Sequence, residues 1–352
     1  MSSIMFRDTE RALPRTTREG LHAFLTRQRP QVIPLTRAAY EKLSAAEKAD
    51  YNRTRLVSLS AGLLVRTPQV SAAEKEIVKL MNGNVDDYSP STGLIISGDA
   101  TLGKSTIAEL LMRRVFMDYR RQNPRYLEHG RVPVVYIVVP TGCTPKLLMV
   151  AFARFFGLTV GTTENADSIK HRVIHMLRAA HTQLVVIDEV HNLQNTNRGN
   201  GESINVLKQL HDDVPATYVY AGVKLAETAL LAGTAGEQLT GRFIRTELTR
   251  YNLSDTEQKQ TWAGIVKSFE SALPLFEHTP GGLAPLNGYL RERTNGSIGS
   301  LWRLLKRAAT MLVDSDGPEI ITQELLDGIV IDMAAEQHYA RKTTTPKNKK
   351  VA

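Results

Sequence analysis

The sequence of 352 residues lacks the features that are typical of secreted and membrane proteins. It contains one cysteine, Cys143, which excludes an intramolecular disulfide framework and a zinc site built from several cysteines. We expect Cys143 to be a small buried apolar residue. No apolar run approaches the roughly 20 residues that a membrane-spanning helix needs, so no membrane partner is expected. The first 20 residues lack the apolar segment of a secretory signal. These absences favour a cytoplasmic, bacterial-type setting.

The charge is unevenly distributed along the chain. The formal net charge is +8, and residues 1–70 hold 12 Lys and Arg against 6 Asp and Glu. Residues 336–352 hold 5 against 1, so the body between these two ends is close to neutral. Basic ends on a neutral body favour contact with a polyanion, most simply nucleic acid. The alternative is a pair of solvated segments that keep the protein soluble.

Short apolar segments alternate with helical patterns in the middle of the chain. Strands are expected at 94–97, 132–139, 183–188, 216–222 and 245–251. Helices are expected between them, over 103–121, from Pro145 to Gly157 behind a Thr144 N-cap, and over 166–181 and 202–212. Strands that are apolar on both faces and alternate with helices indicate an α/β fold with a five-stranded parallel sheet.

Helical patterns without strands follow this α/β region, and they indicate a small all-helical domain. Two capping-box patterns, Ser71 with Glu74 and Ser254 with Glu257, predict helix starts, and 322–339 is expected to form one helix. The predicted organisation has four parts. They are a basic N-terminal extension over 1–70, an α/β nucleotide-binding core over 71–252, a helical lid over 253–335 and a basic disordered tail over 336–352.

A phosphate-binding pattern joins the first expected strand to the first core helix. Gly98, Gly103, Lys104 and Ser105 satisfy G-x-x-x-x-G-K-[ST] (Walker A), in which main-chain N–H groups and the helix N-terminus face phosphate oxygens. Lys104 is expected to reach the β- and γ-phosphates of ATP, and Ser105 to hold Mg²⁺. An ordinary strand-to-helix turn is the alternative. The loop residues expected to contact the nucleotide are Gly98, Asp99, Ala100, Thr101, Leu102, Gly103, Lys104, Ser105 and Thr106.

Two adjacent carboxylates follow the third strand, in "LVVIDEVHNL" (Walker B). At the C-terminal end of a parallel strand they face the ligand crevice. Asp188 is expected to hold Mg²⁺ through water, and Glu189 to polarise the water that attacks the γ-phosphate. A helix N-terminus with favourable dipole contacts is the alternative. His191 either couples this site to other parts of the chain or is an ordinary surface residue.

These motifs and several further stretches resemble the AAA+ ATPases that regulate DNA transposition, of the TniB, TnsC and MuB type. The resemblance is carried by "GLIISGDATLGKSTI", "VVYIVVPTGCTPKLLMVAFARFFGL", "LVVIDEVHNL", "LKQLHDDVPATYVYAGV", "LTGRFIRTELTRYNLSD" and "TNGSIGSLWRLLKRAA". It implies an ATP-dependent ring or filament of identical subunits on double-stranded DNA. It also implies a transposase and a target-selection protein as partners.

The resemblance also assigns single residues. Arg242 matches the arginine that reaches the γ-phosphate of a neighbouring subunit, with Arg245 as a competitor for that role. The first sensor position, usually polar, holds Val223, and Arg303 is the candidate for the second, nucleotide-contacting sensor in the lid. At both sensor positions the sequence departs from the usual pattern of the family. These departures imply an ATPase that acts as a slow switch and not as a fast motor.

Thr144 and Lys146, in "PTGCTPKLL", are the candidate DNA contacts, because a hydroxyl and a lysine at a helix N-terminus can bind a backbone phosphate. A capped helix with a solvated lysine is the alternative. Two rival functions remain at this stage. They are a signalling or scaffold ATPase acting on protein partners, and a replication initiator or helicase loader.

Overall fold

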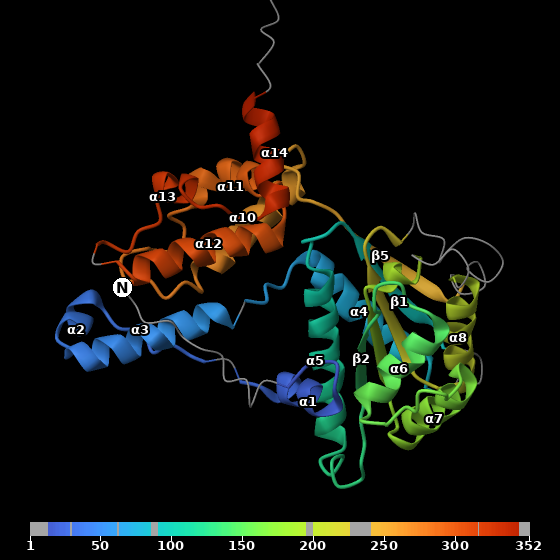
Figure 1. Ribbon diagram of the computed structural model, residues 1–352. Coiled ribbons are helices and arrows are strands. Elements are labelled where there is room, and N and C mark those ends of the chain that lie inside the picture. Colours follow the sequence, from blue (N-terminus) through green and yellow to red (C-terminus); the bar gives the residue numbers. More distant parts are fainter. Residues whose placement is uncertain are drawn as a thin grey trace, which may run out of the picture. The chain divides into compact units, whose positions relative to one another are not determined.

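The computed structural model describes residues 13–28, 30–61, 63–85, 91–194, 200–225, 241–315 and 317–344 (Figure 1). The chain forms two compact units, and each is described by itself. Among the described residues, 13–27 and 68–249 belong to the core unit. The helical unit holds 28–67 and 250–344. The expected boundary after residue 252 lies close to this division, whereas the expected N-terminal extension over 1–70 is shared between the units.

The core unit is built on a five-stranded parallel sheet in the order β2-β3-β4-β1-β5. All four strand pairings are parallel, and β1 lies between β4 and β5. Four of the strands are buried along almost their whole length, as the apolar runs predict, and β5 forms a partly exposed edge. The strands are β1 (Gly93–Gly98), β2 (Val134–Val138), β3 (Leu184–Asp188), β4 (Thr217–Gly222) and β5 (Phe243–Leu248).

Helices cover both faces of the sheet. Right-handed connections between parallel strands place α5 on one face and α6, α7 and α8 on the other, as Figure 1 shows. The core-unit helices are α1 (Arg18–Thr26), α4 (Pro68–Gly83), α5 (Lys104–Gln122), α6 (Pro145–Phe155), α7 (Ala166–Ala179) and α8 (Asn200–Asp213), with the 3₁₀ turn η1 (Val190–Gln194). The expected α/β fold is confirmed.

The start of α6 follows from its sequence. The Thr144 hydroxyl oxygen accepts a hydrogen bond from the N–H of Leu147 at 3.2 Å, and Pro145 occupies the first helical position. Gly157 follows the helix with a φ of 71°, a left-handed conformation that favours glycine. Cys143, just before the cap, is fully buried as expected.

The helical unit has a core of its own, with Trp262, Phe269 and Leu305 among its buried side chains. Its elements are α2 (Arg37–Glu41), α3 (Ala45–Ser60), α10 (Thr256–Glu270), η4 (Ala284–Leu286), α11 (Asn287–Arg293), α12 (Ile298–Val313), α13 (Gln323–Asp327) and α14 (Met333–Thr344). Within the described part of the chain, no helix is long and apolar enough to cross a membrane.

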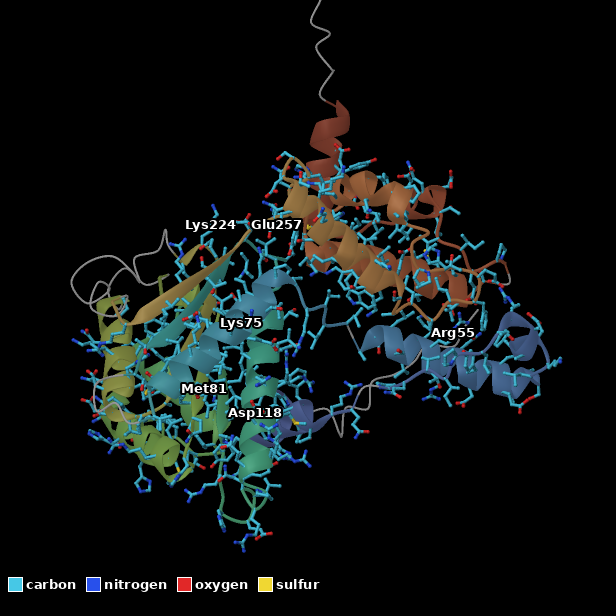
Figure 2. All side chains as sticks on the ribbon, turned by 180° about the vertical axis from the view of Figure 1, so that it is seen from behind. Arg55, Lys75, Met81, Asp118, Lys224 and Glu257 are labelled. Carbon is cyan, nitrogen blue, oxygen red and sulfur yellow. The ribbon has the colours of Figure 1, made fainter. Side chains whose placement is uncertain are left out.

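Arg55 of α3 explains why part of the N-terminal segment belongs to the helical unit (Figure 2). Its guanidinium is buried, forms an ion pair with Glu319, and donates to the carbonyl oxygen of Pro274 at 2.7 Å. Arg37 likewise donates to Glu277 at 2.7 Å. Arg37 and Arg55, which were expected in a basic extension, are therefore paired inside the helical unit.

The core unit holds the other described part of that segment. Arg113 of α5 donates to the carbonyl oxygens of Leu25 and Phe24 at the end of α1. These bonds satisfy carbonyl groups that have no partner inside the helix. Residues 1–12, where the expected N-terminal extension begins, lie outside the described residues.

Both predicted capping boxes are wrong. Helix α4 begins at Pro68, three residues before Ser71, because proline lacks the N–H that the first turn leaves unpaired and its φ suits a helix start. Helix α10 is capped by Asp255, whose carboxylate accepts from the N–H of Glu257 at 2.9 Å. Asp and Ser are equally good caps, so the pattern alone does not choose between neighbours.

The C-terminal region also differs from expectation. The helix predicted over 322–339 is two helices, because Asp332 accepts from the N–H of Ala335 at 3.0 Å and caps a new start. Helix α14 then includes 336–344, part of the predicted disordered tail. Glu336 anchors it through ion pairing with Arg293 at 2.9 Å. The rest of the tail lies outside the described residues.

Candidate active site

The loop after β1 has the backbone that a phosphate cradle requires. Gly98, Thr101 and Gly103 have φ values of 149°, 68° and 92°, and α5 begins at the next residue, Lys104. A side chain at Gly98 would lie 2.7 Å from the carbonyl oxygen of Leu248, so only glycine fits there. The loop thus turns tightly from strand to helix, with its main chain available to phosphate oxygens.

Lys104 is held inside this loop. Its Nζ donates to the carbonyl oxygens of Gly98 at 3.0 Å and Asp99 at 2.7 Å, and the residue is 8% exposed. Burial lowers the pKa of Lys104, and nearby carboxylates, first Glu189 and then Asp188, oppose that shift. The amine therefore lies at the centre of the loop with acidic groups around it, positioned to exchange carbonyl oxygens for phosphate oxygens.

Ser105 and Asp188 lie together, as the two motifs predict. The Ser105 hydroxyl donates to Oδ2 of Asp188 at 2.9 Å, and Asp188 is 3% exposed. Hard oxygen ligands of this kind suit Mg²⁺, which typically binds one or two protein groups together with substrate phosphates. Within the described ranges no cluster of three His, Cys, Asp or Glu residues could hold a metal without help. The donor set therefore fits an ion shared with a nucleotide.

Tyr136 belongs to this site, although no sequence pattern singles it out. Its hydroxyl donates to the same Asp188 oxygen at 3.0 Å from the buried strand β2. Burial, with Asp188 close by, raises the pKa of Tyr136 well above its usual value, so the phenol keeps its proton. In the sequence, a tyrosine inside "VVYIV" is indistinguishable from an ordinary apolar strand residue.

Glu189 follows Asp188 with an unusual backbone. Its φ is 57°, its N–H donates to Oδ1 of Asp188 at 2.8 Å, and its side chain is 41% exposed. A left-handed conformation costs a non-glycine residue roughly 1–2 kcal/mol and persists where neighbouring contacts require it. The carboxylate is thereby turned out of the strand direction beside the phosphate loop.

Arg242 lies at the opposite end of the sheet from this loop. Its carbonyl oxygen accepts from the N–H of Gly93, at the start of β1, whereas the loop begins at Gly98, at the end. At about 3.3 Å per residue these ends are about 17 Å apart. The guanidinium forms an ion pair with Asp212 at 2.7 Å.

Arg245 lies closer to the phosphate loop along the same strand pair. It pairs with Glu247 at 2.6 Å, and Glu247 accepts a hydrogen bond from Ser97, the residue before the loop. Arg245 is therefore tied to groups near the loop of its own chain, and Arg242 is not.

The two remaining candidates, Lys146 and Arg303, have partners of their own. Lys146 donates to the carbonyl oxygen of Thr162 at 3.1 Å near the exposed N-terminus of α6. Arg303 belongs to the helical unit, where it pairs with Asp332 at 2.9 Å. Burial alone would raise the pKa of Asp332, but hydrogen bonds from Ala335 and Ser300, together with Arg303, lower it.

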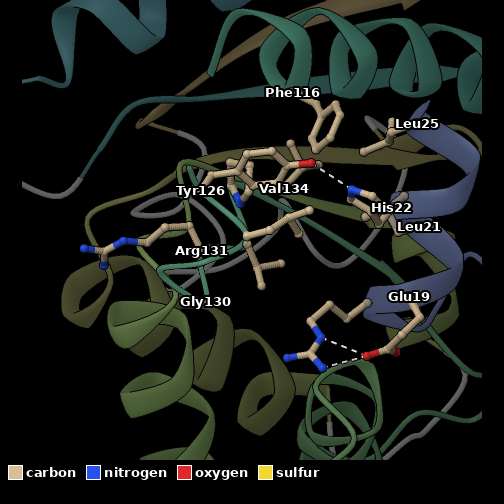
Figure 3. A pocket seen from close by; sticks show the side chains of 13 residues that line it. Glu19, Leu21, His22, Leu25, Phe116, Tyr126, Gly130, Arg131 and Val134 are labelled. Carbon is tan, nitrogen blue, oxygen red and sulfur yellow. Dashed lines mark hydrogen bonds and ion pairs between the residues drawn. The ribbon is translucent and has the colours of Figure 1, made fainter. Parts of the chain in front are cut away.

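A separate cavity of about 370 Å³ lies in the core unit (Figure 3). It is lined by α1, the later part of α5 and the segment before β2, and the Tyr126 hydroxyl lies 2.7 Å from Nε2 of His22 at its wall. None of the residues of the phosphate loop lines it. The cavity is therefore separate from the candidate nucleotide site at the loop.

Comparison with known families decides the family. Residues 55–253, more than half of the chain, match the model described as "Bacterial TniB protein". The chain belongs to the TniB family. This TniB protein is an AAA+ ATPase. A comparison with curated proteins finds no match.

Solved structures share the fold. The ORC1 protein of Aeropyrum pernix in complex with DNA is 15% identical, with a TM-score of 0.56 over 82% of this chain and 70% of that chain. The ORC2 protein of Aeropyrum pernix, in ADPNP and ADP complexes, is 14% identical, with a TM-score of 0.57 over 79% and 68%. Cdc6p of Pyrobaculum aerophilum is 14% identical, with a TM-score of 0.51 over 77% and 73%. At this identity the likeness shows the fold alone.

Proposed function

We propose that this TniB-family protein is an ATP-dependent, DNA-binding regulator of DNA transposition. With ATP bound, identical subunits assemble on double-stranded DNA as a ring or filament. The assembly recruits or activates a transposase at a site chosen with a target-selection protein, and it comes apart after hydrolysis. The observation that carries the proposal is the family match over 55–253, which contains the assembled phosphate loop and its two carboxylates.

The proposed chemistry uses the groups already in place. Lys104 and the main-chain N–H groups of residues 98–106 bind the phosphates of ATP. Ser105 and Asp188, the latter through water, hold Mg²⁺, which neutralises phosphate charge when it is bound. Glu189 accepts a proton from the attacking water. Tyr136 keeps Asp188 oriented through its hydrogen bond.

Arg242 completes the site of a neighbouring subunit in this proposal. Its position at the far end of β1 supports a role outside its own site. A guanidinium beside the γ-phosphate stabilises charge that develops during hydrolysis. Activity then depends on assembly. Arg303 is proposed to contact the nucleotide from the helical unit.

DNA binding is proposed at the start of α6. Thr144 uses its oxygen as the helix cap, so its O–H remains able to donate to a phosphate, and Lys146 supplies charge from the exposed first turn. One subunit offers few such contacts, and non-specific binding of this kind is weak, about 10⁻⁴–10⁻⁶ M at physiological salt. Assembly multiplies these contacts along one backbone.

The proposal is tested by the fluorescence anisotropy of labelled double-stranded DNA titrated with protein, at several salt concentrations. A non-hydrolysable ATP analogue should give much tighter binding than ADP, with little sequence preference and a steep decrease as salt rises. Lys146→Ala should flatten the salt slope. Lys79→Ala, which removes a 73% exposed lysine from α4, is the matched control and should leave the slope unchanged.

Undetectable affinity at low salt with the analogue would refute the DNA proposal. ATP hydrolysis without DNA binding would instead favour an ATPase that acts as a scaffold for protein partners. A strong preference for one DNA sequence would favour a replication initiator.

A further inference from the structure

The turn that follows β4 lies between the two halves of the nucleotide site. Strand β4 is flanked by β3, which ends at Asp188, and by β1, which ends at Gly98. The turn comprises Val223, Lys224 (Figure 2) and Leu225. Any group that fixes this turn to its neighbours therefore connects it with residues that act on the nucleotide.

His191 connects the turn to Glu189. Its Nδ1 accepts a hydrogen bond from the N–H of Val223 at 3.3 Å, and its Nε2 lies 3.2 Å from Oε2 of Glu189. A ring nitrogen that accepts from a main-chain N–H carries no proton, so in the neutral ring the proton lies on Nε2. The Nε2–H of His191 therefore lies beside the Glu189 carboxylate, in a contact of 3.2 Å. The main chain at Val223 sets the tautomer.

Two further features hold the turn in place. The hydroxyl oxygen of Ser97 accepts from the N–H of Leu225 at 3.1 Å, directly before the phosphate loop. At Gly222, an added Cβ would lie 2.8 Å from the side chain of Leu225 and 3.3 Å from the main-chain nitrogen of His191. Both distances are shorter than ordinary van der Waals contact, so the main chain at Gly222 packs closely against Leu225 and His191.

We propose that His191 is the positioning residue for Glu189, and that it is itself oriented by the main-chain N–H of Val223. The side chain of Val223 is apolar and cannot hydrogen-bond to Glu189. The imidazole supplies a polar contact to Glu189 in its place. The proposal rests on the role proposed above for Glu189 and adds the group that controls it.

The physical effect is to restrict a carboxylate that would otherwise move. The Glu189 side chain is 41% exposed, and an exposed glutamate has several accessible rotamers. The contact with His191 is made through Oε2, so Oε1 is available to accept the proton of a water molecule. Displacement of a catalytic group by about 1 Å can reduce the rate about a hundredfold. His191 therefore acts on the rate of hydrolysis and not on nucleotide affinity.

Three substitutions at His191 separate its two contacts. His191→Phe keeps a ring and removes both. His191→Asn places an acceptor near the position of Nδ1, so it keeps the contact to Val223 and loses the one to Glu189. His191→Gln places an N–H near the position of Nε2, so it keeps the contact to Glu189. His171→Phe, at an exposed position on α7, is the matched control.

The experiment measures steady-state kcat and KM for ATP hydrolysis, and Kd for a fluorescent ATP analogue, on the full chain with DNA present. His191→Phe and His191→Asn should lower kcat by about ten- to a hundredfold, with the analogue Kd within about twofold of wild type. His191→Gln should restore kcat to within a few-fold of wild type. His171→Phe should match wild type.

A double variant makes the result specific to Glu189. In the Glu189→Gln background, His191→Phe should lower kcat no further, because both substitutions remove one function. An unchanged or faster kcat for His191→Phe would overturn the proposal. So would a loss that is equally large in the Glu189→Gln background, or a rise in Kd that parallels the loss of kcat. If wild type itself does not hydrolyse ATP, the proposed function fails instead.

Discussion

At the scale of single residues, Lys104 is the group on which we predict nucleotide binding to depend most. Its amine is buried and held by two carbonyl oxygens that phosphate oxygens can replace. Lys104→Ala should weaken ATP binding by at least about thirtyfold, because loss of one partner from a desolvated charged contact costs about 2–5 kcal/mol. Isothermal titration with an ATP analogue measures this. Binding within about twofold of wild type would place the phosphates elsewhere.

Glu189→Gln addresses hydrolysis separately from binding. The amide keeps the shape of the side chain and loses the basic oxygen, so kcat should fall by about a hundredfold or more while ATP affinity is retained. Phosphate release under saturating ATP provides the rate. Hydrolysis at the wild-type rate would show that another group activates the water.

His211 ties the stability of the core unit to pH. Its ring is 2% exposed and stacks on Tyr218 with centroids 3.8 Å apart. Burial, with Arg242 nearby, lowers the pKa of His211 to about 3, from an ordinary value of 6.5. Because the unfolded chain binds the proton more readily, stability contributed at neutral pH is lost as pH falls below about 6.5. The slope is about 1.4 kcal/mol per pH unit.

His211→Phe should remove that slope, since phenylalanine keeps the stacked ring and cannot bind a proton. Urea unfolding at pH 7.5, 6.0 and 5.0 gives the free energy of unfolding of each protein. The exposed His129→Phe is the control and should keep the wild-type slope. Equal pH dependence in wild type and His211→Phe would exclude His211 as the source.

At the scale of elements, α3 is held in the helical unit by the ion pair of Arg55 and Glu319, whose side chains are 1% and 3% exposed. Arg55→Met should lower the free energy of unfolding by about 3–5 kcal/mol, because it leaves Glu319 buried without its counter-ion. The double variant with Glu319→Gln should recover most of that loss, since the amide oxygen can still accept from the N–H of Phe276.

Urea denaturation of the three proteins provides the comparison. A double variant no more stable than Arg55→Met alone would show that the charge of Glu319 is satisfied by other groups. It would then be the packing of the arginine stem, and not the ion pair, that holds α3.

The elements of the core unit could be predicted because their signals are local. Four of the five strands are short apolar runs, and α6 begins at a threonine cap followed by proline. Predicted helix starts were wrong where two neighbouring residues were equally suitable as N-caps, as with Ser254 and Asp255. The break at Asp332 was missed because the surrounding residues are apolar at helical spacing. The position of α3 was not predictable, since its contacts with Glu319 join residues far apart in sequence.

The residues of the candidate site also fall into two groups, those with a recognisable sequence pattern and those without one. Lys104, Ser105 and Asp188 are recognisable because phosphate and Mg²⁺ chemistry requires those residue types at that spacing. Tyr136 and His191 act through contacts that only the order of strands creates: β2 beside β3 for the first, and β4 beside β3 for the second. Periodicity reports burial of a strand residue and says nothing about which carboxylate its hydroxyl reaches.

At the scale of the whole molecule, we predict an active site that one chain alone does not complete. Arg242 lies beside the start of β1, about 17 Å of strand away from the loop at its end. Its present partner, Asp212, is 40% exposed, so the guanidinium is exchangeable at the surface. A neighbouring subunit that presents its phosphate loop to this edge would gain the guanidinium of Arg242.

Mixing two inactive variants tests this claim most directly. Arg242→Ala and Glu189→Gln should each hydrolyse ATP poorly alone. In a mixture, an Arg242→Ala subunit keeps an intact Glu189 and can receive Arg242 from a Glu189→Gln neighbour. We therefore predict that phosphate release, measured across mixing ratios with DNA present, rises above both pure variants and is greatest near equal amounts. Activity at or below the pure variants at every ratio, with normal assembly of Arg242→Ala, would contradict a site shared between subunits.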